Sequence, residues 1–190
     1  MMKVLHDASF NETNTQLIAL DDSLDVYKQA PGREERGLGV YRVPTFIFYE
    51  KGKEVSRIVD FAVKSIERDV FKVAHRETNV PNYRVYSQIN QWLANGLLQY
   101  PNTSARGVAA QLKPVSNSES ELNACGYVLM AQGALQESIV VLRINASLYP
   151  DSANCWDSLG EAYAKANQKE RAIEMYEYGL QLDPQSTNAK

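Results

Sequence analysis

The chain has 190 residues, of which 44% are hydrophobic and 23% are charged, and this length allows one large globular domain or two small ones. The formal net charge is -3, with acids and bases interspersed, so we expect neither nucleic acid nor a membrane surface as a partner. No apolar run reaches the roughly 18 residues of a membrane span, and the opening MMKVLHDASF lacks the apolar core of a signal peptide. The expected location is therefore cytoplasmic, a prediction that a lost N-terminal segment would change.

Metal sites, cofactors and catalytic groups are not expected. Cys125 and Cys155 are the only cysteines, and their spacing is typical of neither a zinc site nor a disulfide framework. The two histidines, His6 and His75, are too few for a metal cluster. The sequence has neither a nucleophile elbow nor a phosphate-binding glycine loop. We therefore predict no catalytic residues, no cofactor and no metal, and the sequence favours a protein that is not an enzyme.

The residues before about Tyr83 alternate between strand and helix patterns. The stretch TQLIALDD, which starts at Thr15, is a short apolar run typical of a buried parallel strand. GREERGLGVY, after Pro31, predicts one short helix. TFIFYE, over 45–50, predicts a second strand, followed by a reversal in which Gly52 takes a positive φ and by an antiparallel partner, EVSRIVDF.

Helices are expected in the rest of the chain. Ser65 is the predicted N-cap of a helix whose apolar face covers the sheet. A further helix is expected from Tyr83, with helical spacing that continues up to Pro101. Another is expected from Ser104 to Leu112.

The C-terminal residues repeat at a fixed offset. Gly126 recurs as Gly160, and Pro150 recurs as Pro184 at the same spacing. Residues of compatible type recur at this offset at four more pairs of positions: Leu122 and Trp156, Cys125 and Leu159, Ser138 and Ala172, and Leu142 and Tyr176.

This period and these residue types resemble the tetratricopeptide repeat, a helix-turn-helix unit of about 34 residues. The resemblance is strong over 153–186 and weaker over 119–152, where Leu122 stands in place of the family's tryptophan. It implies two antiparallel helices in each unit, packed closely at the glycine. The stretch SESE, from Ser118 to Glu121, predicts a capping box at the start of the first unit.

The resemblance also implies where a ligand would bind, because the first helix of each unit lines a concave groove in this family. Asp157 and Glu161 would make that groove partly acidic and suited to a basic or polar peptide, although an ordinary solvated face is the alternative. Ile173 and Tyr176 are expected to be only partly shielded, which leaves a homodimer open. The candidate peptide-binding residues are Asn123, Tyr127, Met130, Asp157, Glu161 and Lys165.

The N-terminal part resembles another family. GLGVYRVPTFIFYEKGKEVSRIVDF and the SIERDVFKVA helix are similar to the C-terminal half of the thioredoxin fold, in which a strand begins just after a cis proline. The resemblance covers about 15–74. It implies that Pro44 is this proline and that Val43, Pro44 and Thr45 form the site at which the family binds the extended backbone of a substrate.

The chain departs from the thioredoxin pattern where the chemistry occurs. No cysteine precedes Cys125, so the strand and helix that carry the reactive thiols are missing, and thiol exchange needs a thiolate of lowered pKa. If the missing central strand buries about four large apolar side chains, its absence removes on the order of 6 to 12 kcal/mol, which rivals the roughly 5 to 15 kcal/mol of a whole domain. We expect the remaining strands to re-pair, to pack on the helical half, or to borrow a strand from another chain.

The fold class predicted from these patterns combines α/β and all-α parts. A partial thioredoxin-like domain is expected at 1–82, a helical connector or cap at 83–117, and two tetratricopeptide repeats, 119–152 and 153–186, at 118–190. The predicted function is non-catalytic binding of a protein or peptide through the concave face of the repeats. The alternatives are a fragment of a thiol-disulfide oxidoreductase whose active-site cysteine lies upstream, and a structural protein that forms oligomers.

Overall fold

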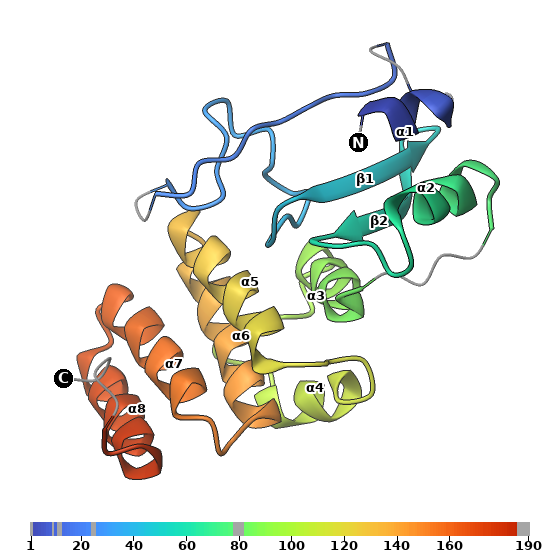
Figure 1. The fold of residues 1–190 in the computed structure, drawn as a ribbon. Coiled ribbons are helices and arrows are strands. Elements are labelled where there is room, and N and C mark those ends of the chain that lie inside the picture. Colours follow the sequence, from blue (N-terminus) through green and yellow to red (C-terminus); the bar gives the residue numbers. More distant parts are fainter. Residues whose placement is uncertain (1, 9, 11–12, 24–25, 78–81, 186–190) are drawn as a thin grey trace. The chain divides into compact units, whose positions relative to one another are not determined.

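A computed structural model describes residues 2–8, 10, 13–23, 26–77 and 82–185 (Figure 1). The described residues divide into two compact units. The first unit comprises residues up to Asp21 together with 28–84, and the second comprises the segment between them and the residues from Val85 onward. None of the described helices is long and apolar enough to cross a lipid bilayer.

The first unit is built on a β-hairpin. Strand β1 (Thr45–Glu50) pairs antiparallel with β2 (Lys53–Val59), with Thr45 opposite Val59. Lys51 and Gly52 connect the strands with positive φ values of 50° and 76°, which are typical of the two-residue turn that matches the natural twist of a hairpin. The predicted hairpin and the positive φ at Gly52 are therefore confirmed.

Two helices pack with the hairpin around a small apolar core. These are α1 (Met2–Asp7) and α2 (Ile66–Ala74). The core joins Leu5 of α1, Phe48 and Ile58 of the hairpin, and Val70 of α2. The Ser65 hydroxyl accepts a hydrogen bond from the Arg68 N–H at 3.3 Å, which confirms the predicted N-cap of α2.

The strand expected at 15–22 is wrong. These residues form neither strand nor helix, and Leu17 is 91% exposed. Among the described residues the sheet contains only β1 and β2, so this segment has no strand beside it to complete a ladder. Asp21 instead pairs with the returning chain, since its N–H donates to the Gln29 carbonyl at 2.9 Å and its carbonyl accepts from the Lys28 N–H at 2.8 Å.

The short helix expected after Pro31 is also wrong. The chain there runs in turns held by charged side chains that lie inside the unit. The Glu35 carboxylate accepts a hydrogen bond from the Ala30 N–H at 2.9 Å. The Arg57 guanidinium donates to the carbonyls of Leu38 and Gly39 at 2.9 and 3.0 Å, so these carbonyls are bonded to a side chain of β2 and not to a helical N–H.

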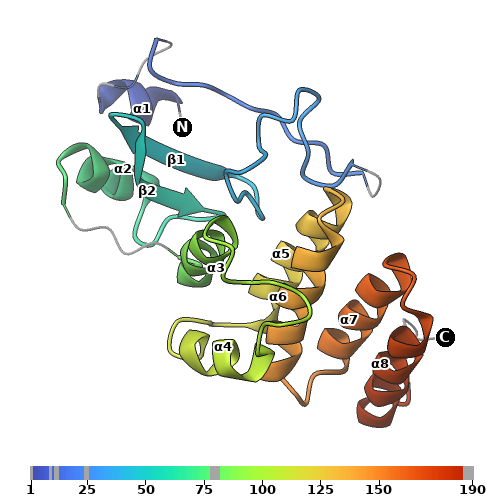
Figure 2. The same cartoon turned by 180° about the vertical axis from the view of Figure 1, so that it is seen from behind.

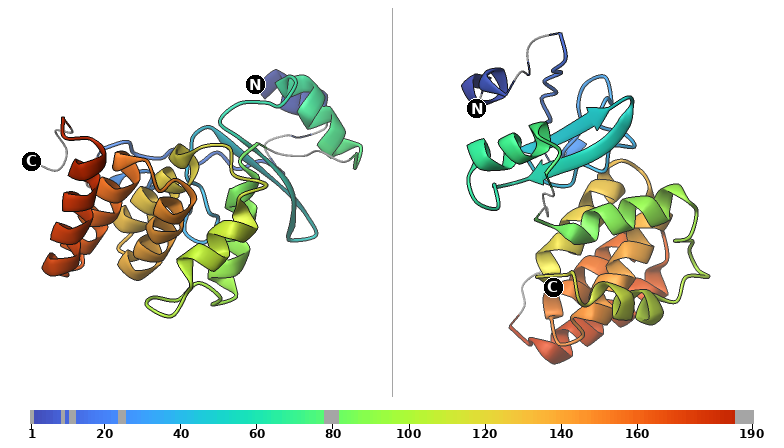
Figure 3. Two further views of the ribbon diagram at one scale, coloured as in Figure 1. Left: turned by 90° about the horizontal axis from the view of Figure 1, so that it is seen from below. Right: turned by 90° about the vertical axis from the view of Figure 1, so that its right-hand side faces the viewer.

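The second unit is helical. Helix α4 packs on α6, and α6 also packs on α5 and α7 (Figure 2). Helices α5 and α6 form one antiparallel pair and α7 and α8 another, and the two pairs lie side by side (Figure 3). The helices are α3 (Arg84–Ala94), α4 (Ala105–Leu112), α5 (Glu119–Ala131), α6 (Leu135–Leu148), α7 (Ala153–Lys165) and α8 (Lys169–Leu182).

The ends of α3 and α4 test two predictions. Helix α4 begins after its N-cap Ser104 and ends at Leu112, as predicted. Helix α3 ends at Ala94, well before Pro101. Gly96 takes a φ of 66°, and the Leu97 N–H donates back to the Trp92 carbonyl at 2.8 Å, a motif that closes a helix at a left-handed glycine.

Close packing within each helix pair occurs at a glycine. A Cβ added at Gly126 would lie 2.5 Å from a side-chain carbon of Leu142 on α6. A Cβ at Gly160 would lie 2.7 Å from the ring of Tyr176 on α8. The two glycines thus have the same role in two helix pairs whose sequences are offset by one repeat length, because no larger residue fits at this distance.

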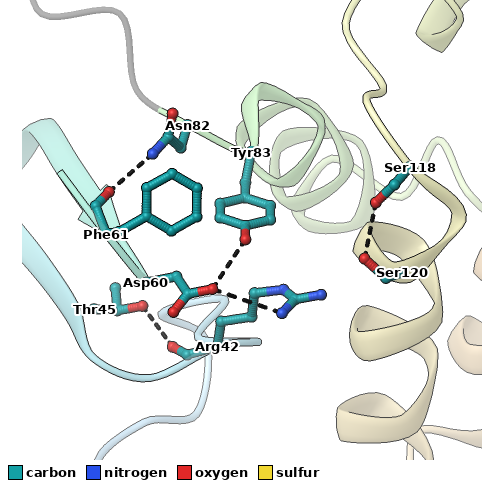
Figure 4. Close-up of polar contacts among 8 residues, drawn as sticks. All are labelled: Arg42, Thr45, Asp60, Phe61, Asn82, Tyr83, Ser118 and Ser120. Atoms are coloured by element: carbon teal, nitrogen blue, oxygen red, sulfur yellow. Dashed lines mark hydrogen bonds and ion pairs between the residues drawn. The ribbon is translucent and has the colours of Figure 1, made fainter. Parts of the chain in front are cut away.

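The capping box predicted at Ser118 is wrong in its details. The Ser118 side chain makes no capping bond and contacts the Ser120 hydroxyl at 2.8 Å (Figure 4). The buried Glu121 carboxylate instead accepts from the Asn117 N–H at 3.0 Å, one residue before the expected position. It also accepts from the Asn117 side chain at 3.0 Å and from the Ser116 hydroxyl at 3.3 Å. Glu121 thus orders the chain that enters α5.

Candidate functional site

The first helices of the two pairs, α5 and α7, are joined by polar side chains. We call Asn123, Tyr127, Ser158, Glu161 and Lys165 the α5/α7 face. Asn123 and Tyr127 lie four residues apart on α5, and Glu161 and Lys165 lie four residues apart on α7, so each pair occupies one side of its helix.

A hydrogen bond from Tyr127 to Glu161 links the two helices. The Tyr127 hydroxyl donates to Glu161 Oε2 at 2.8 Å and lies 3.5 Å from the Ser158 hydroxyl. Tyr127 and Glu161 are separated by one repeat length, so they occupy the same position in the two helix pairs. The bond therefore joins equivalent positions of the two neighbouring helix pairs.

Burial keeps the Tyr127 phenol protonated. The pKa of Tyr127 is raised to about 12, chiefly by desolvation and also by the nearby Glu161 carboxylate, which favours the O–H form, against an opposing effect of the Ser158 hydroxyl. Across the physiological range Tyr127 is thus a hydrogen-bond donor. It holds the Glu161 side chain in a fixed position.

Glu161 has a second partner, and this one is exposed. Lys165 Nζ lies 3.2 Å from Glu161 Oε1, and the two side chains are 55% and 39% exposed, respectively. An ion pair of this kind, four residues apart on a helix surface, contributes only about 0.3 to 0.5 kcal/mol. Lys165 can therefore leave Glu161 at little cost when another cation approaches.

The other three predicted site residues differ in exposure. Asn123 is partly exposed, and its Oδ1 is buried without a hydrogen-bond partner among the described residues. Met130 is 5% exposed and belongs to the core between the helix pairs. Asp157 is 5% exposed and lies against Gly179 of α8. Met130 and Asp157 therefore offer little surface to a ligand.

Sequence reasoning missed two groups at this interface. Ser158 is adjacent in sequence to a predicted residue, but a serine in a helix carries no pattern that would mark it. Glu119, at the start of α5, accepts a hydrogen bond from the Asn154 side chain of α7 at 3.0 Å. Comparing positions close to one repeat length apart for complementary polar types would have found this second bridge.

The Pro44 region in the first unit is the other predicted site. The Val43–Pro44 peptide bond is cis. The Thr45 hydroxyl donates to the Arg42 carbonyl at 2.6 Å, so this group of the predicted site already has a partner (Figure 4). Val43 is partly exposed. The substrate-binding role of these residues stays a prediction.

A cluster of polar and aromatic side chains surrounds this turn. The Asp60 carboxylate accepts from the Tyr83 hydroxyl at 3.0 Å and lies 3.7 Å from the Arg42 guanidinium, which stacks over the Tyr83 ring at 5.0 Å (Figure 4). The Asn82 side chain donates to the Phe61 carbonyl at 2.8 Å. These contacts attach the chain before α3 to the end of the hairpin.

Both cysteines lie in the core of the second unit. Cys125 and Cys155 are buried and form no disulfide with each other. Burial raises the pKa of Cys155 to about 12, and the Glu119 carboxylate, 3.6 Å from its sulfur, opposes the thiolate. Cys155 is therefore a protonated thiol at neutral pH, and it has none of the electropositive surroundings of a nucleophilic cysteine. Among the described residues no three His, Cys, Asp or Glu side chains are grouped to hold a metal ion.

The comparison with known families fits this geometry. Residues 153–186 match the family model of the tetratricopeptide repeat. The match covers α7 and α8, so this helix pair is a tetratricopeptide repeat within a helical C-terminal region. No curated protein matches the chain. Repeats of this type stack in arrays whose extended surfaces bind other proteins, which makes protein interaction the activity to consider.

Proposed function

We propose that this chain is a non-catalytic interaction module and that its α5/α7 face binds a polar or basic peptide segment of a partner protein. The observation that carries the proposal is the bond from Tyr127 to Glu161, since it fixes a partly exposed carboxylate between two repeat helices. A carboxylate held in one orientation loses little further entropy when it binds a cation.

Binding would proceed by exchange at Glu161. A lysine or arginine of the peptide takes the position of Lys165 on Glu161 Oε1, and Tyr127 keeps its bond to the other oxygen. Asn123, one turn earlier on α5 than Tyr127, supplies an amide for the peptide backbone. The binding constant should therefore weaken with salt, because a surface ion pair is screened.

The proposal treats residues 119–152 as a second tetratricopeptide repeat. Two features support this: α5 and α6 pack at Gly126 as α7 and α8 pack at Gly160, and the two glycines are one repeat length apart. Residues 83–117, which hold α3 and α4, then form the connector, and residues 1–82 a separate domain.

A selection experiment tests the proposal. A random peptide library is selected on the full-length chain and, in parallel, on Glu161→Lys and Glu170→Lys variants. Glu170 lies on α8 and is exposed, so the second variant makes the same charge change outside the α5/α7 face. We expect lysine- and arginine-containing peptides on the wild type and on Glu170→Lys, and their loss on Glu161→Lys. Equal enrichment on all three proteins would contradict the proposal.

A second candidate is a fragment of a thioredoxin-like oxidoreductase whose reactive cysteine lies upstream. It is favoured by the order of elements, since β1 follows Pro44 directly and is succeeded by an antiparallel β2 and by α2. The chain's own thiols are buried and cannot supply the chemistry. This polypeptide should therefore not reduce insulin, and a Cys-containing strand and helix encoded in frame upstream would support this candidate.

We also propose a cytoplasmic location and association of the chain with itself.

A further inference from the structure

The outer edge of β1 carries backbone groups that have no backbone partner among the described residues. The Asp60 N–H donates to the Pro44 carbonyl at 2.8 Å, so Pro44 is a hydrogen-bonded position of the ladder. Phe46 and Phe48, two and four residues later, are the next positions whose backbone groups face β2. Because hydrogen-bonded and non-bonded pairs alternate in an antiparallel ladder, Thr45, Ile47 and Tyr49 direct their N–H and C=O groups away from β2. No backbone bond from these groups is found within the described part of the chain.

The two edges of this hairpin differ in how they are protected. Strand β2 has charged residues at Lys53, Glu54 and Arg57, and a bulge beside Val55 interrupts its register. These are the features by which an edge strand avoids pairing with another strand. From Thr45 to Tyr49, β1 has no charge, no glycine, no proline and no bulge of its own. Only β1 is suited to accept a further strand.

The two-stranded sheet has covering helices but no third strand among the described residues. A hairpin alone is marginally stable in water, and independent stability needs a third strand or a covering helix. Helices α1 and α2 cover the face that carries Phe48 and Ile58, through Leu5 and Val70. A strand added at the β1 edge would extend the apolar face that Phe46 and Phe48 begin.

We propose that β1 pairs antiparallel with β1 of a second copy of this chain, with Ile47 opposite Ile47 of that copy. In this register Thr45 lies opposite Tyr49 of the second copy, and Tyr49 opposite Thr45. Each of these pairs exchanges two N–H···O=C bonds, and the two hairpins become one four-stranded sheet with a two-fold axis. The inference deepens the self-association proposed above and does not depend on the α5/α7 face.

The side chains on β1 fit this register. Ile47 against itself is a β-branched pair, and Tyr49 against Thr45 is an aromatic and β-branched pair, both of which stabilise antiparallel strands. Glu50 meets Pro44, so no like charges lie opposite each other along the strand. A partner strand that carries charges or a proline would not form these side-chain pairs. Strand β1 of a second copy forms all of them, and it is therefore the occupant proposed for this edge.

Disulfide trapping tests the register. The Cα atoms of a hydrogen-bonded antiparallel pair lie about 5.5 Å apart, inside the roughly 4.4 to 6.8 Å range of disulfides. The Ile47→Cys variant should cross-link to itself under mild oxidation. Tyr49→Cys alone should not, whereas a mixture of Thr45→Cys and Tyr49→Cys should form the mixed dimer. Val55→Cys on β2, at a position about as exposed as Tyr49, is the control and should stay monomeric on a reducing-agent-free gel.

Light scattering on the unmodified chain provides the second measurement. We expect a dimer whose fraction rises with protein concentration, and its loss in Ile47→Lys or Ile47→Pro. The proline removes an N–H that β2 does not use, so the β1–β2 ladder keeps its donors. A monomer at every concentration would overturn the inference, as would a dimer that Ile47→Cys fails to trap. The Glu161→Lys variant should dimerise like the wild type, which separates this test from that of the α5/α7 face.

Discussion

Tyr127 fixes the position of the acidic group on the α5/α7 face. Its ring is partly buried between α5 and α7, and its hydroxyl is directed at the Glu161 carboxylate. Without that donor, Glu161 would be one more flexible acid paired loosely with Lys165. With it, one carboxylate oxygen is fixed and the other can exchange partners.

The high pKa of Tyr127 predicts a specific dependence of stability on pH. Its folded-state pKa of about 12 lies above the ordinary value of 10.0, so its contribution is complete below pH 10 and is lost as the pH rises to about 12. The free energy of unfolding, measured from pH 9 to 12, should fall more steeply for the wild type than for Tyr127→Phe. Parallel curves for the two proteins would show that Tyr127 titrates normally.

At this scale the structure shows which of the candidate residues are accessible, while their role as a binding site stays a prediction. The resemblance to the tetratricopeptide repeat put Tyr127, Glu161 and Lys165 on first helices, where the structure joins them. It did not predict the burial of Met130 and Asp157. Which side of a helix is buried depends on how the neighbouring helix packs against it, and the residue types along one helix do not predict that packing.

Among the elements, the paired helices depend on two close approaches. Leu142 lies against Gly126 in one pair and Tyr176 against Gly160 in the other. Each large side chain fills the space that its glycine leaves, so the two residues at each contact act as a unit.

The Gly126 contact predicts a non-additive result. Gly126→Ala forces a methyl group against Leu142 and should lower the free energy of unfolding by roughly 1 to 3 kcal/mol. In a Leu142→Ala background the same substitution has room, and alanine's helix propensity should make it stabilising by up to ~1 kcal/mol. Urea denaturation of the four proteins measures the cycle. If the change in the double variant equals the sum of the changes in the two single variants, the contact is not tight.

Two substitutions at the start of α5 should differ in their stability cost, in the order opposite to that expected if Ser118 capped the helix. Glu121 is buried and accepts the Asn117 N–H, so Glu121→Ala should cost about 1 to 3 kcal/mol. Ser118 makes no capping bond, and Ser118→Ala should cost less than ~0.5 kcal/mol, below the usual value for an N-cap. Thermal unfolding compares the stability of the two variants, and a larger loss of stability for Ser118→Ala would support the capping box.

Elements defined by local rules were predictable, whereas those that need a distant partner were not. The hairpin at 45–59 follows from its turn, and α2 and α4 follow from Ser65 and Ser104. The segment at 15–22 has the composition of a strand, but no described strand lies beside it to accept its hydrogen bonds. The turns after Pro31 are held by Arg57, a residue of another element.

On the scale of the whole molecule, we propose two separate interaction features, one in each unit. The second unit contributes polar side chains from α5 and α7, and the first contributes the backbone of β1. In these proposals the two features use different chemistry, since the first would bind a cation and the second would pair with an extended strand. Variants at Glu161 and Ile47 should therefore affect partner binding and self-association separately.

The central claim is that Glu161, fixed by Tyr127, binds the cation of a partner peptide. The most direct measurement is the dissociation constant of a lysine-containing peptide from the library selection, taken by fluorescence polarisation for the wild type, Glu161→Lys and Glu170→Lys. We predict that Glu161→Lys weakens binding at least tenfold, about 1.4 kcal/mol, and that Glu170→Lys leaves it within about twofold, with circular dichroism confirming that both variants fold. Equal dissociation constants for the two variants would contradict the account.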